Sequence, residues 1–392
     1  MKCFNWKLIM VLLIPAIMFG QGVTVSTDSG LDIVLGGEVE LEFIDVEGAG
    51  GFANQDLTYQ KVKNRSPHMR IDMAILSARV NYNENLYYQI EYRFDDQSAY
   101  VDKQYARLNV PGINTKFEMG KNRPFVSTKR ASEGYPLIGT AFWKGREAHL
   151  NSETEMKLGE NGKLIGGLSF AMKRPLGTDD AAEDKSFKMM VYDDYEPKNG
   201  QTFEYGVKVG AELAGLSLLG WYFTGELIDD WDWKISLKQS IANYDKRGDE
   251  TDKTHYWYGG RVTYQMAGMQ VRGEYIDAQD GLLDRYGYYG EGSYALKAPA
   301  FLQSNSIKLL GRYGILRIRP GTDEATGNKI AWAYLSEAMS WNREMITLSA
   351  MLNINENLAL KIEHYILEEE TGSDVETGVD DNQSLLQINF KF

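Results

Sequence analysis

The densest group of side chains that could bind a charged solute lies in one segment of the first half of the chain. Six residues in it are basic, Lys121, Arg123, Lys129, Arg130, Lys144 and Arg146, and two are acidic, Glu133 and Glu147. Guanidinium and ammonium groups bind anions through charge-assisted hydrogen bonds, and a concentration of positive charge attracts anions from solution. The composition of residues 121–147 therefore indicates a site for small anions. A solvated loop whose charges do nothing specific is the alternative.

Further cations precede this segment in runs of alternating polar and apolar residues. Arg93, Lys103 and Arg107 all have the polar parity of their runs, so they should point the same way. Other cations with inward parity are Arg79, Lys116, Lys208, Arg261, Arg272, Lys308, Arg312 and Lys361. Acids with the same parity are Glu91, Glu118, Glu204, Glu212, Glu274 and Glu363, and we expect some to pair with cations across adjacent strands.

The chain has only four histidines that could act as the base of an enzyme. His68 lies in a predicted loop, His149 and His255 lie at the beginnings of predicted strands, and His364 has the apolar parity of its run. A serine hydrolase needs a serine beside its histidine base and a third group that orients the base. No serine lies two residues from His364, and spacing assembles no triad from the others. We expect no catalytic residue and no enzymatic activity.

Carboxylates that could hold calcium lie in predicted loops. They are Asp179, Asp180, Asp193, Asp194, Glu368, Glu369, Glu370, Asp374, Asp380 and Asp381. None has the spacing of a defined calcium loop, and acidic outer loops are ordinary in exported proteins. We therefore predict no metal site and no cofactor.

The elements that position these residues are predicted to be β-strands. Leu86, Tyr88, Ile90, Tyr92 and Phe94 alternate with polar residues, and the same pattern recurs along the chain. It recurs in Ala106, Leu108 and Val110, and again in Phe203, Tyr205, Val207 and Val209. The chain ends in such a run, with Leu386, Ile388, Phe390 and Phe392 on one face. A strand that ends the chain on an aromatic residue is typical of an outer-membrane β-barrel.

Short turns separate these runs. They are expected at Asn83–Asn85, Pro111–Gly112, Glu160–Gly162, Ala214–Gly215, Ala267–Gly268, Ala298–Ser304 and Asn355–Asn357. Seven inner turns with both chain ends on the inner side give sixteen strands. The segments Trp231–Tyr244 and Lys329–Trp341 also alternate, so eighteen strands are the alternative. The basic loop follows the fifth strand, where we expect it to fold inward and narrow a water-filled lumen.

The N-terminus and the composition suit an exported barrel. Lys2 and Lys7 precede an apolar run, Leu8–Phe19, that is too short to span a membrane, so residues 1–20 are predicted to be a signal peptide and 21–392 one barrel domain. The single cysteine, Cys3, excludes disulfides from the mature chain. Removal of two lysines would change the formal charge from −13 to −15, which makes nucleic acid an improbable partner.

Several short motifs resemble the phosphate-selective porin (O and P type) family of Gram-negative outer membranes. Gly120–Phe125 is similar to a Gly-Lys-x-Lys-x-Pro-Phe segment of that family, and Tyr288–Tyr294, Leu310–Gly314 and Gln387–Phe392 are similar to its late strands and its ending. The resemblance implies a sixteen-stranded, trimeric outer-membrane porin. It also implies a phosphate preference that rests on arginines and lysines along the bore.

The sequence thus predicts an all-β transmembrane antiparallel barrel with long outer loops, one of them folded inward. We expect a passive diffusion channel in the outer membrane, surrounded by lipid, for small hydrophilic solutes and in particular anions such as phosphate. Two alternatives stay open. A sugar-type porin would use aromatic residues such as Tyr135, Phe142, Trp143, Trp231 and Trp233, and a structural or adhesive barrel would need no selective lumen.

Overall fold

The computed structural model describes residues 22–26, 30–46, 51–52, 59–60, 67–94, 98–180, 188–197, 202–228, 253–281, 283–297, 306–319, 340–371, 379–380 and 382–392. The expected signal peptide lies outside these residues. Among the residues described, no helix has the length and the apolar character that crossing a membrane requires.

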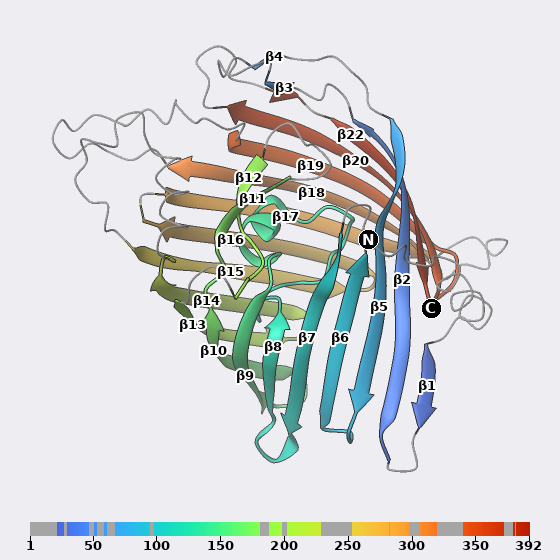
Figure 1. The fold of residues 1–392 in the computed structure, drawn as a ribbon, viewed down its shortest axis with the longest axis vertical. Coiled ribbons are helices and arrows are strands. Elements are labelled where there is room, and N and C mark those ends of the chain that lie inside the picture. Colours follow the sequence, from blue (N-terminus) through green and yellow to red (C-terminus); the bar gives the residue numbers. More distant parts are fainter. Residues whose placement is uncertain are drawn as a thin grey trace, which may run out of the picture.

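Sixteen antiparallel strands form one closed barrel, in which each strand pairs with the next (Figure 1). They are β2 (Asp32–Val46), β5 (His68–Asn81), β6 (Leu86–Phe94), β7 (Ala99–Val110), β8 (Thr115–Asn122), β9 (Glu147–Leu158), β10 (Gly162–Met172), β13 (Phe203–Leu213), β14 (Leu216–Glu226), β15 (Thr254–Met266), β16 (Met269–Asp280), β17 (Leu283–Lys297), β18 (Ser306–Arg319), β19 (Ser340–Asn353), β20 (Leu358–Thr371) and β22 (Gln383–Lys391). The predicted class and strand number are confirmed, and the eighteen-strand alternative is wrong. Of the two extra segments, Trp231–Tyr244 lies outside the described residues. Residues 329–339 of the second segment also lie outside them, and its last two residues, Ser340 and Trp341, begin β19.

The barrel closes where its first strand meets its last. β2 pairs with β5 along one edge and with β22 along the other. The terminal Phe392 exchanges two backbone hydrogen bonds with Gly37 of β2, at 2.8 and 3.0 Å. The extra strand β1 (Val23–Ser26) pairs with Asp32–Leu35 and so continues the edge that β22 leaves. The predicted C-terminal strand is therefore the seam of the barrel.

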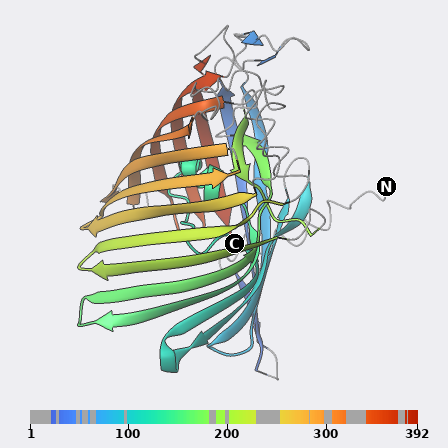
Figure 2. The same ribbon diagram turned by 90° about the vertical axis from the view of Figure 1, so that its left-hand side faces the viewer.

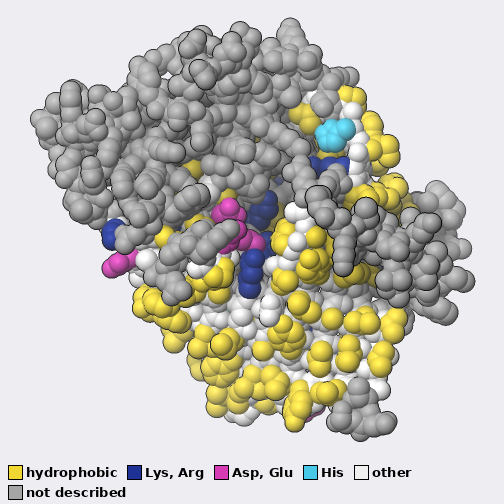
Figure 3. All heavy atoms as spheres, in the orientation of Figure 1, with side chains coloured by type: hydrophobic (Ala, Val, Ile, Leu, Met, Phe, Trp, Pro, Cys, Tyr) yellow, Lys and Arg dark blue, Asp and Glu magenta, His cyan; other side chains and the backbone are white. Residues whose placement is uncertain are grey.

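Side chains alternate between the two faces of the wall as predicted. Tyr205, Val207 and Val209 are 54%, 41% and 64% exposed, whereas Glu204 and Lys208 between them are buried. Hydrophobic side chains cover much of the outer surface in Figure 3, while the visible charged side chains gather above them. An apolar outer face around a polar interior is the pattern of a membrane-embedded barrel.

Tight turns join the strands at one end of the barrel. Six of the seven predicted turns connect consecutive strands, and the seventh, Ala298–Ser304, lies outside the described residues. Ala214 and Gly215 both have positive φ, 47° and 85°, and Ala267 and Gly268 repeat this at 43° and 83°. Positive φ at both central residues is the requirement of the two-residue hairpin turn that matches strand twist. A 3₁₀ turn, Pro111–Ile113, joins β7 to β8.

The core of the molecule lies inside the barrel. A cluster of buried apolar side chains joins residues of the β8–β9 loop, among them Phe142 and Trp143 in a π-helical turn (Gly139–Trp143), to the hairpin of β11 (Leu176–Asp180) and β12 (Lys188–Tyr192). Wall residues such as Phe223 and Trp257 complete it. In Figures 1 and 2 these segments lie between opposite sides of the barrel. The short strands β3 (Gly51–Phe52) and β4 (Tyr59–Gln60) pair with each other outside the barrel wall, and the short strand β21 (Val379–Asp380) pairs with the end of β20.

Candidate functional site

The loop between β8 and β9, residues 123–146, lies inside the barrel. Its first residues are held by cations of the wall: Lys208 of β13 donates to the Phe125 carbonyl at 2.7 Å, and Arg261 of β15 donates to the Val126 carbonyl at 2.7 Å. An extended loop has backbone carbonyls that no neighbouring strand satisfies, so inward arginines and lysines serve as its hydrogen-bond donors. The loop follows the fifth barrel strand, as predicted.

The middle of the loop reaches the seam side of the barrel. Arg130 forms an ion pair at 3.1 Å with Glu40 of β2, and the Glu133 amide donates to Glu363 of β20 at 2.9 Å. Arg312 of β18 donates to the Gly134 carbonyl at 2.8 Å. The loop therefore crosses the lumen, and the alternative of a solvated outer loop is wrong.

The loop returns along the wall formed by β16 and β17. The Trp143 indole donates to Glu274 of β16 at 3.0 Å, and Ile138 lies so close to Gly287 of β17 that a Cβ there would come within 2.5 Å of its side chain. Arg174 donates to the Phe142 carbonyl at 2.7 Å. Because Phe142 and Trp143 are fully buried, neither can offer a face to a passing sugar.

Three of the six predicted loop cations are neutralised by acids from other segments. Lys121 pairs at 3.1 Å with Asp194, which follows β12, and Arg146 pairs with Asp194 at 3.4 Å and with Asp102 of β7. Arg130 pairs with Glu133 as well as with Glu40. The segment's excess of positive charge is therefore smaller in the structure than in the sequence.

These ion pairs hold the loop in its charged form. Burial alone would lower the pKa of Arg130, but the Glu40 carboxylate raises it above its ordinary value. Burial would likewise raise the pKa of Asp194, but Arg146 and Lys121 hold it below its ordinary value of 3.8. The paired cations and acids are thus anchors for the loop.

Arg123 and Lys129 have no carboxylate partner in the part of the chain that the structure describes. The Arg123 guanidinium lies 5.0 Å from the centre of the Tyr135 ring, and its Nε is buried without an acceptor. Burial lowers the pKa of Arg123, although a guanidinium keeps its charge at neutral pH. Lys129 is exposed, and Lys144 is half-buried. Arg123 and Lys129 are therefore the loop cations best able to meet a solute.

The three cations predicted on the wall, Arg93, Lys103 and Arg107, also divide into paired and unpaired residues. Lys103 pairs with Glu91 at 2.5 Å, and Arg107 pairs with Glu118, to which its Nε donates at 2.9 Å. Arg93 has no ion pair with any residue described. All three lie on β6 and β7 with inward parity, as predicted.

A cavity of about 470 Å³ lies between the first part of the loop and the wall formed by strands β9 to β16. Thr128 of the loop lines it together with Lys208, Arg261 and Arg272, and with Glu153 and Glu212. Lys208 pairs with Glu153, and Arg261 pairs with Glu274 at 2.7 Å. Cations and acids are mixed here, so this cavity is a polar vestibule rather than a basic one.

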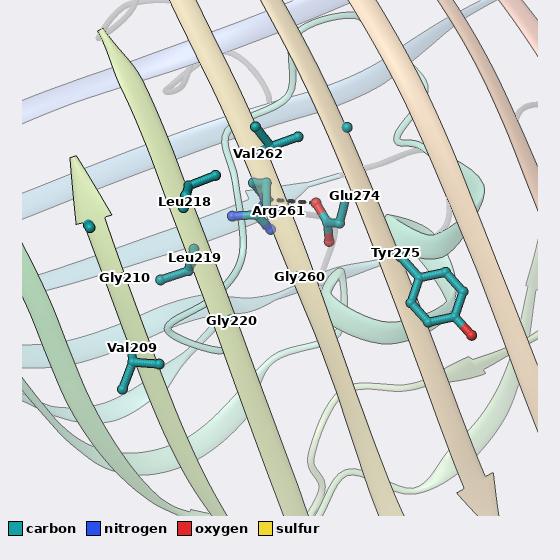
Figure 4. A pocket seen from close by; sticks show the side chains of 12 residues that line it. Val209, Gly210, Leu218, Leu219, Gly220, Gly260, Arg261, Val262, Glu274 and Tyr275 are labelled. Atoms are coloured by element: carbon teal, nitrogen blue, oxygen red, sulfur yellow. Dashed lines mark hydrogen bonds and ion pairs between the residues drawn. The ribbon is translucent and has the colours of Figure 1, made fainter. Parts of the chain in front are cut away.

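A second depression, of about 720 Å³, lies on the outer face of the wall. Figure 4 shows Val209, Leu218, Val262 and Tyr275 on that side of strands β13 to β16. Arg261 and its partner Glu274 lie on the other side of the same strands (Figure 4). Because Val209, Leu218, Val262 and Tyr275 are exposed, the depression opens toward the outer face.

Both strand-end histidines lie between two carboxylates. His149 contacts Glu118 and Glu147 at 3.1 and 3.2 Å. His255 contacts Glu204 at 2.6 Å and Asp280 at 2.7 Å. The residues are buried, and the Tyr192 hydroxyl of β12 donates to the same Asp280 at 3.0 Å. These networks fasten the wall and the β11–β12 hairpin, which gives both histidines a structural role.

His364 has a serine partner that the sequence reasoning missed. Its Nδ1 lies 3.0 Å from Ser384 Oγ, because the two residues face each other across β20 and β22 on the outer wall. The acid paired with Ser384 across the strands, Asp45 of β2, lies on the side of Ser384 away from His364. A nucleophile and base need a third group that orients the base, and the described neighbours of His364 on β19 and β20 supply none.

Three carboxylates come close enough to suggest a metal site. Oxygen atoms of Glu40, Asp72 and Glu133 lie within 4.8 Å of one another. Arg130 pairs with Glu40 and Glu133, and Arg70 pairs with Asp72 at 3.0 Å. Each of the three carboxylates is thus already paired with an arginine of the protein. The acidic loop residues named from the sequence include Asp194, which is likewise paired with Arg146 and Lys121.

Comparisons place the fold among outer-membrane channels. No protein-family model matches the chain, and no curated protein matches it. OprB of Pseudomonas putida has a TM-score of 0.59 at 10% identity, over 99% of this chain and 97% of its own. The outer membrane channel DcaP of Acinetobacter baumannii has a TM-score of 0.58 at 12% identity, over 94% and 99%. An anion-selective porin from Comamonas acidovorans has a TM-score of 0.56 at 11% identity, over 92% and 100%.

Proposed function

We propose that this chain is a passive diffusion channel of a Gram-negative outer membrane, for small hydrophilic solutes and preferentially for anions. The observation that carries the proposal is the loop across the lumen, in which Arg123 and Lys129 have no described carboxylate partner. A sixteen-stranded barrel leaves room for water. Uncompensated positive charge at a narrow point raises the local concentration of anions.

The similar structures support the same proposal. They are outer-membrane channels, and one of them is described as anion-selective. One form of OmpT of Vibrio cholerae with this fold is a trimer, at a TM-score of 0.54 and 12% identity. We propose a homotrimer in contact with outer-membrane lipid, formed after residues 1–20 are removed. Phosphate is the solute that the resemblance to the O and P type porins suggests.

We propose no catalytic residue and no cofactor. The Ser384 and His364 pair lies on the lipid-facing side and lacks an orienting acid among its described neighbours. The sugar-porin alternative loses its support from Phe142 and Trp143, which are buried. Trp231 and Trp233 lie outside the described residues. A structural or adhesive barrel is the remaining alternative, and it predicts no selective conductance.

The experiment is the reversal potential of refolded protein in planar bilayers across a KCl gradient, with the variant Arg123→Gln/Lys129→Gln. We expect the chloride over potassium permeability ratio to fall by a factor on the order of two to five, because the two charges together contribute roughly 0.5 to 1 kcal/mol in a water-filled lumen. Arg317→Gln is the control, because Arg317 pairs with Glu344 outside the lumen.

Equal chloride over potassium permeability ratios in the wild type and in the double variant would contradict the proposed role of the loop in anion selectivity. Absence of channels from well-folded protein would instead favour the structural or adhesive alternative. The variant leaves Lys121 and Arg130 in place, because both residues are ion-paired and their replacement would also remove anchors of the loop.

A further inference from the structure

A group of arginine and tyrosine side chains lies on the inner face of β5, β6 and β7, next to the turn that joins β5 to β6. It consists of Arg79 of β5, Tyr87 of β6, and Tyr105 and Arg107 of β7, and we call it the arginine–tyrosine wall. Asn81, Tyr87 and Arg107 are registered opposite one another across the three strands. The loop contacts β7 through the Arg146–Asp102 ion pair, and no described hydrogen bond or ion pair joins the loop to these four residues. Its other anchors lie on β13, β15, β18 and β20.

Arg79 is oriented without being neutralised. Its guanidinium carbon lies 4.8 Å from the centre of the Tyr87 ring, and its Nε donates to the Asn81 side-chain oxygen at 2.9 Å. Both partners are neutral, and no carboxylate pairs with Arg79 in the described part of the chain. Arg79 is exposed. A stacked guanidinium is held in one plane, so its remaining N–H groups form a fork that is ready for an anion.

Arg107 adds aromatic contact and little net charge. It lies 5.6 Å from the Tyr87 ring centre and 5.4 Å from that of Tyr105, and it is paired with Glu118. The two tyrosine rings meet edge to face, with centres 6.3 Å apart. The wall therefore combines one uncompensated positive charge, on Arg79, with the half-buried ring of Tyr87, while the adjacent Tyr105 is buried and supports that ring.

We infer that the arginine–tyrosine wall binds organic anions that carry one carboxylate on a flat apolar body. A carboxylate is planar and matches the guanidinium fork with two parallel hydrogen bonds. A flat apolar body gains contact with the stacked arginine and tyrosine side chains. A phosphate dianion would meet only one uncompensated positive charge here, and it has no apolar surface that could contact the aromatic rings. The inference rests on the proposed channel function and narrows its solute class.

The first test compares permeabilities of benzoate, acetate and phosphate, taken from reversal potentials with potassium as the common cation. A featureless lumen passes acetate more easily than benzoate, because acetate is smaller. We expect wild type to reverse this order and to place phosphate below benzoate. Acetate equal to or above benzoate would overturn the inference.

The second test assigns the preference to the wall. Arg79→Lys keeps the charge and removes the fork, and Tyr87→Leu removes the ring. We expect each to lower the benzoate over acetate ratio by about two- to fivefold, which is the range of an exposed cation–π contact. Arg93→Lys is the matched control, because no aromatic ring has been found stacked under Arg93 among the described residues. Heat-modifiable electrophoretic mobility verifies that each variant folds.

The two proposals fail in distinguishable ways. Anion selectivity in KCl with an unchanged benzoate over acetate ratio in both wall variants would overturn this inference and leave the channel function standing. Cation selectivity in KCl, or no channels, would overturn the proposed function itself.

Discussion

At the scale of single residues, ion pairing decides which of the many charges can act on a solute. Lys121, Arg130 and Arg146 look like pore cations in the sequence, yet each is neutralised by an acid. Arg123 lies on a tyrosine and Lys129 is exposed. Buried or half-buried pairs contribute mainly to position, and unpaired groups contribute to the electrostatic field of the lumen.

Arg130 gives a prediction at this scale. Arg130→Gln removes the shared partner of Glu40 and Glu133, both of which are buried. Because Lys361 remains 2.8 Å from Glu133, we expect a moderate loss of about 1–2 kcal/mol in the free energy of unfolding. Urea unfolding in detergent measures it, and Arg130→Lys, which keeps the charge, should lose less. An unchanged unfolding midpoint in Arg130→Gln would show that the pair does not anchor the loop.

At the scale of elements, the loop and the segment after β12 depend on each other. Asp194 accepts from the backbone amide of Arg146 at 2.9 Å and pairs with Lys121. It thereby joins both ends of the β8–β9 loop to the chain that follows the β11–β12 hairpin. One carboxylate thus fastens two inserts that fill the lumen.

The pH dependence of this attachment follows from the direction of the Asp194 pKa. Burial alone would raise that pKa, but Arg146 and Lys121 lower it below 3.8. A carboxyl whose pKa is lowered by folding contributes stability above its unfolded pKa and loses it as the pH falls through the folded value. We expect open-channel noise to stay constant from pH 7 to about 4.5 and to rise only below 3.8.

Asp194→Asn is the control for that prediction. It removes the charge at every pH, so its channel noise should be raised already at pH 7. A rise in wild-type noise near pH 5, or a quiet Asp194→Asn channel, would contradict the attachment.

The elements themselves could largely be predicted from the sequence, because alternation and turn chemistry are local. The Ala214–Gly215 and Ala267–Gly268 turns were expected from the residues alone. The partners of the loop could not be predicted in this way. Asp194 lies 48 residues beyond Arg146, and Asp102 sits at an irregularity between β6 and β7 that breaks strand parity. Such contacts depend on how the inserts pack in three dimensions.

At the scale of the whole molecule, the barrel follows from a small number of sequence features. The terminal aromatic strand, the seven turns and the alternating runs were sufficient for the strand number. The Ser384 and His364 contact was missed because it joins different strands, so its two members are far apart in sequence. The net charge that a solute meets in the lumen also depends on ion pairs, which composition alone does not show.

The most direct test of the account places a cysteine at Lys129. If the signal peptide is removed, Cys3 goes with it, and a Lys129→Cys channel carries a single thiol. During a bilayer recording in KCl, a negatively charged methanethiosulfonate reagent should lower the chloride over potassium permeability ratio, and a positively charged one should restore it toward wild type. If both reagents leave the reversal potential unchanged although the thiol is modified, the loop does not control anion passage and the central claim is wrong.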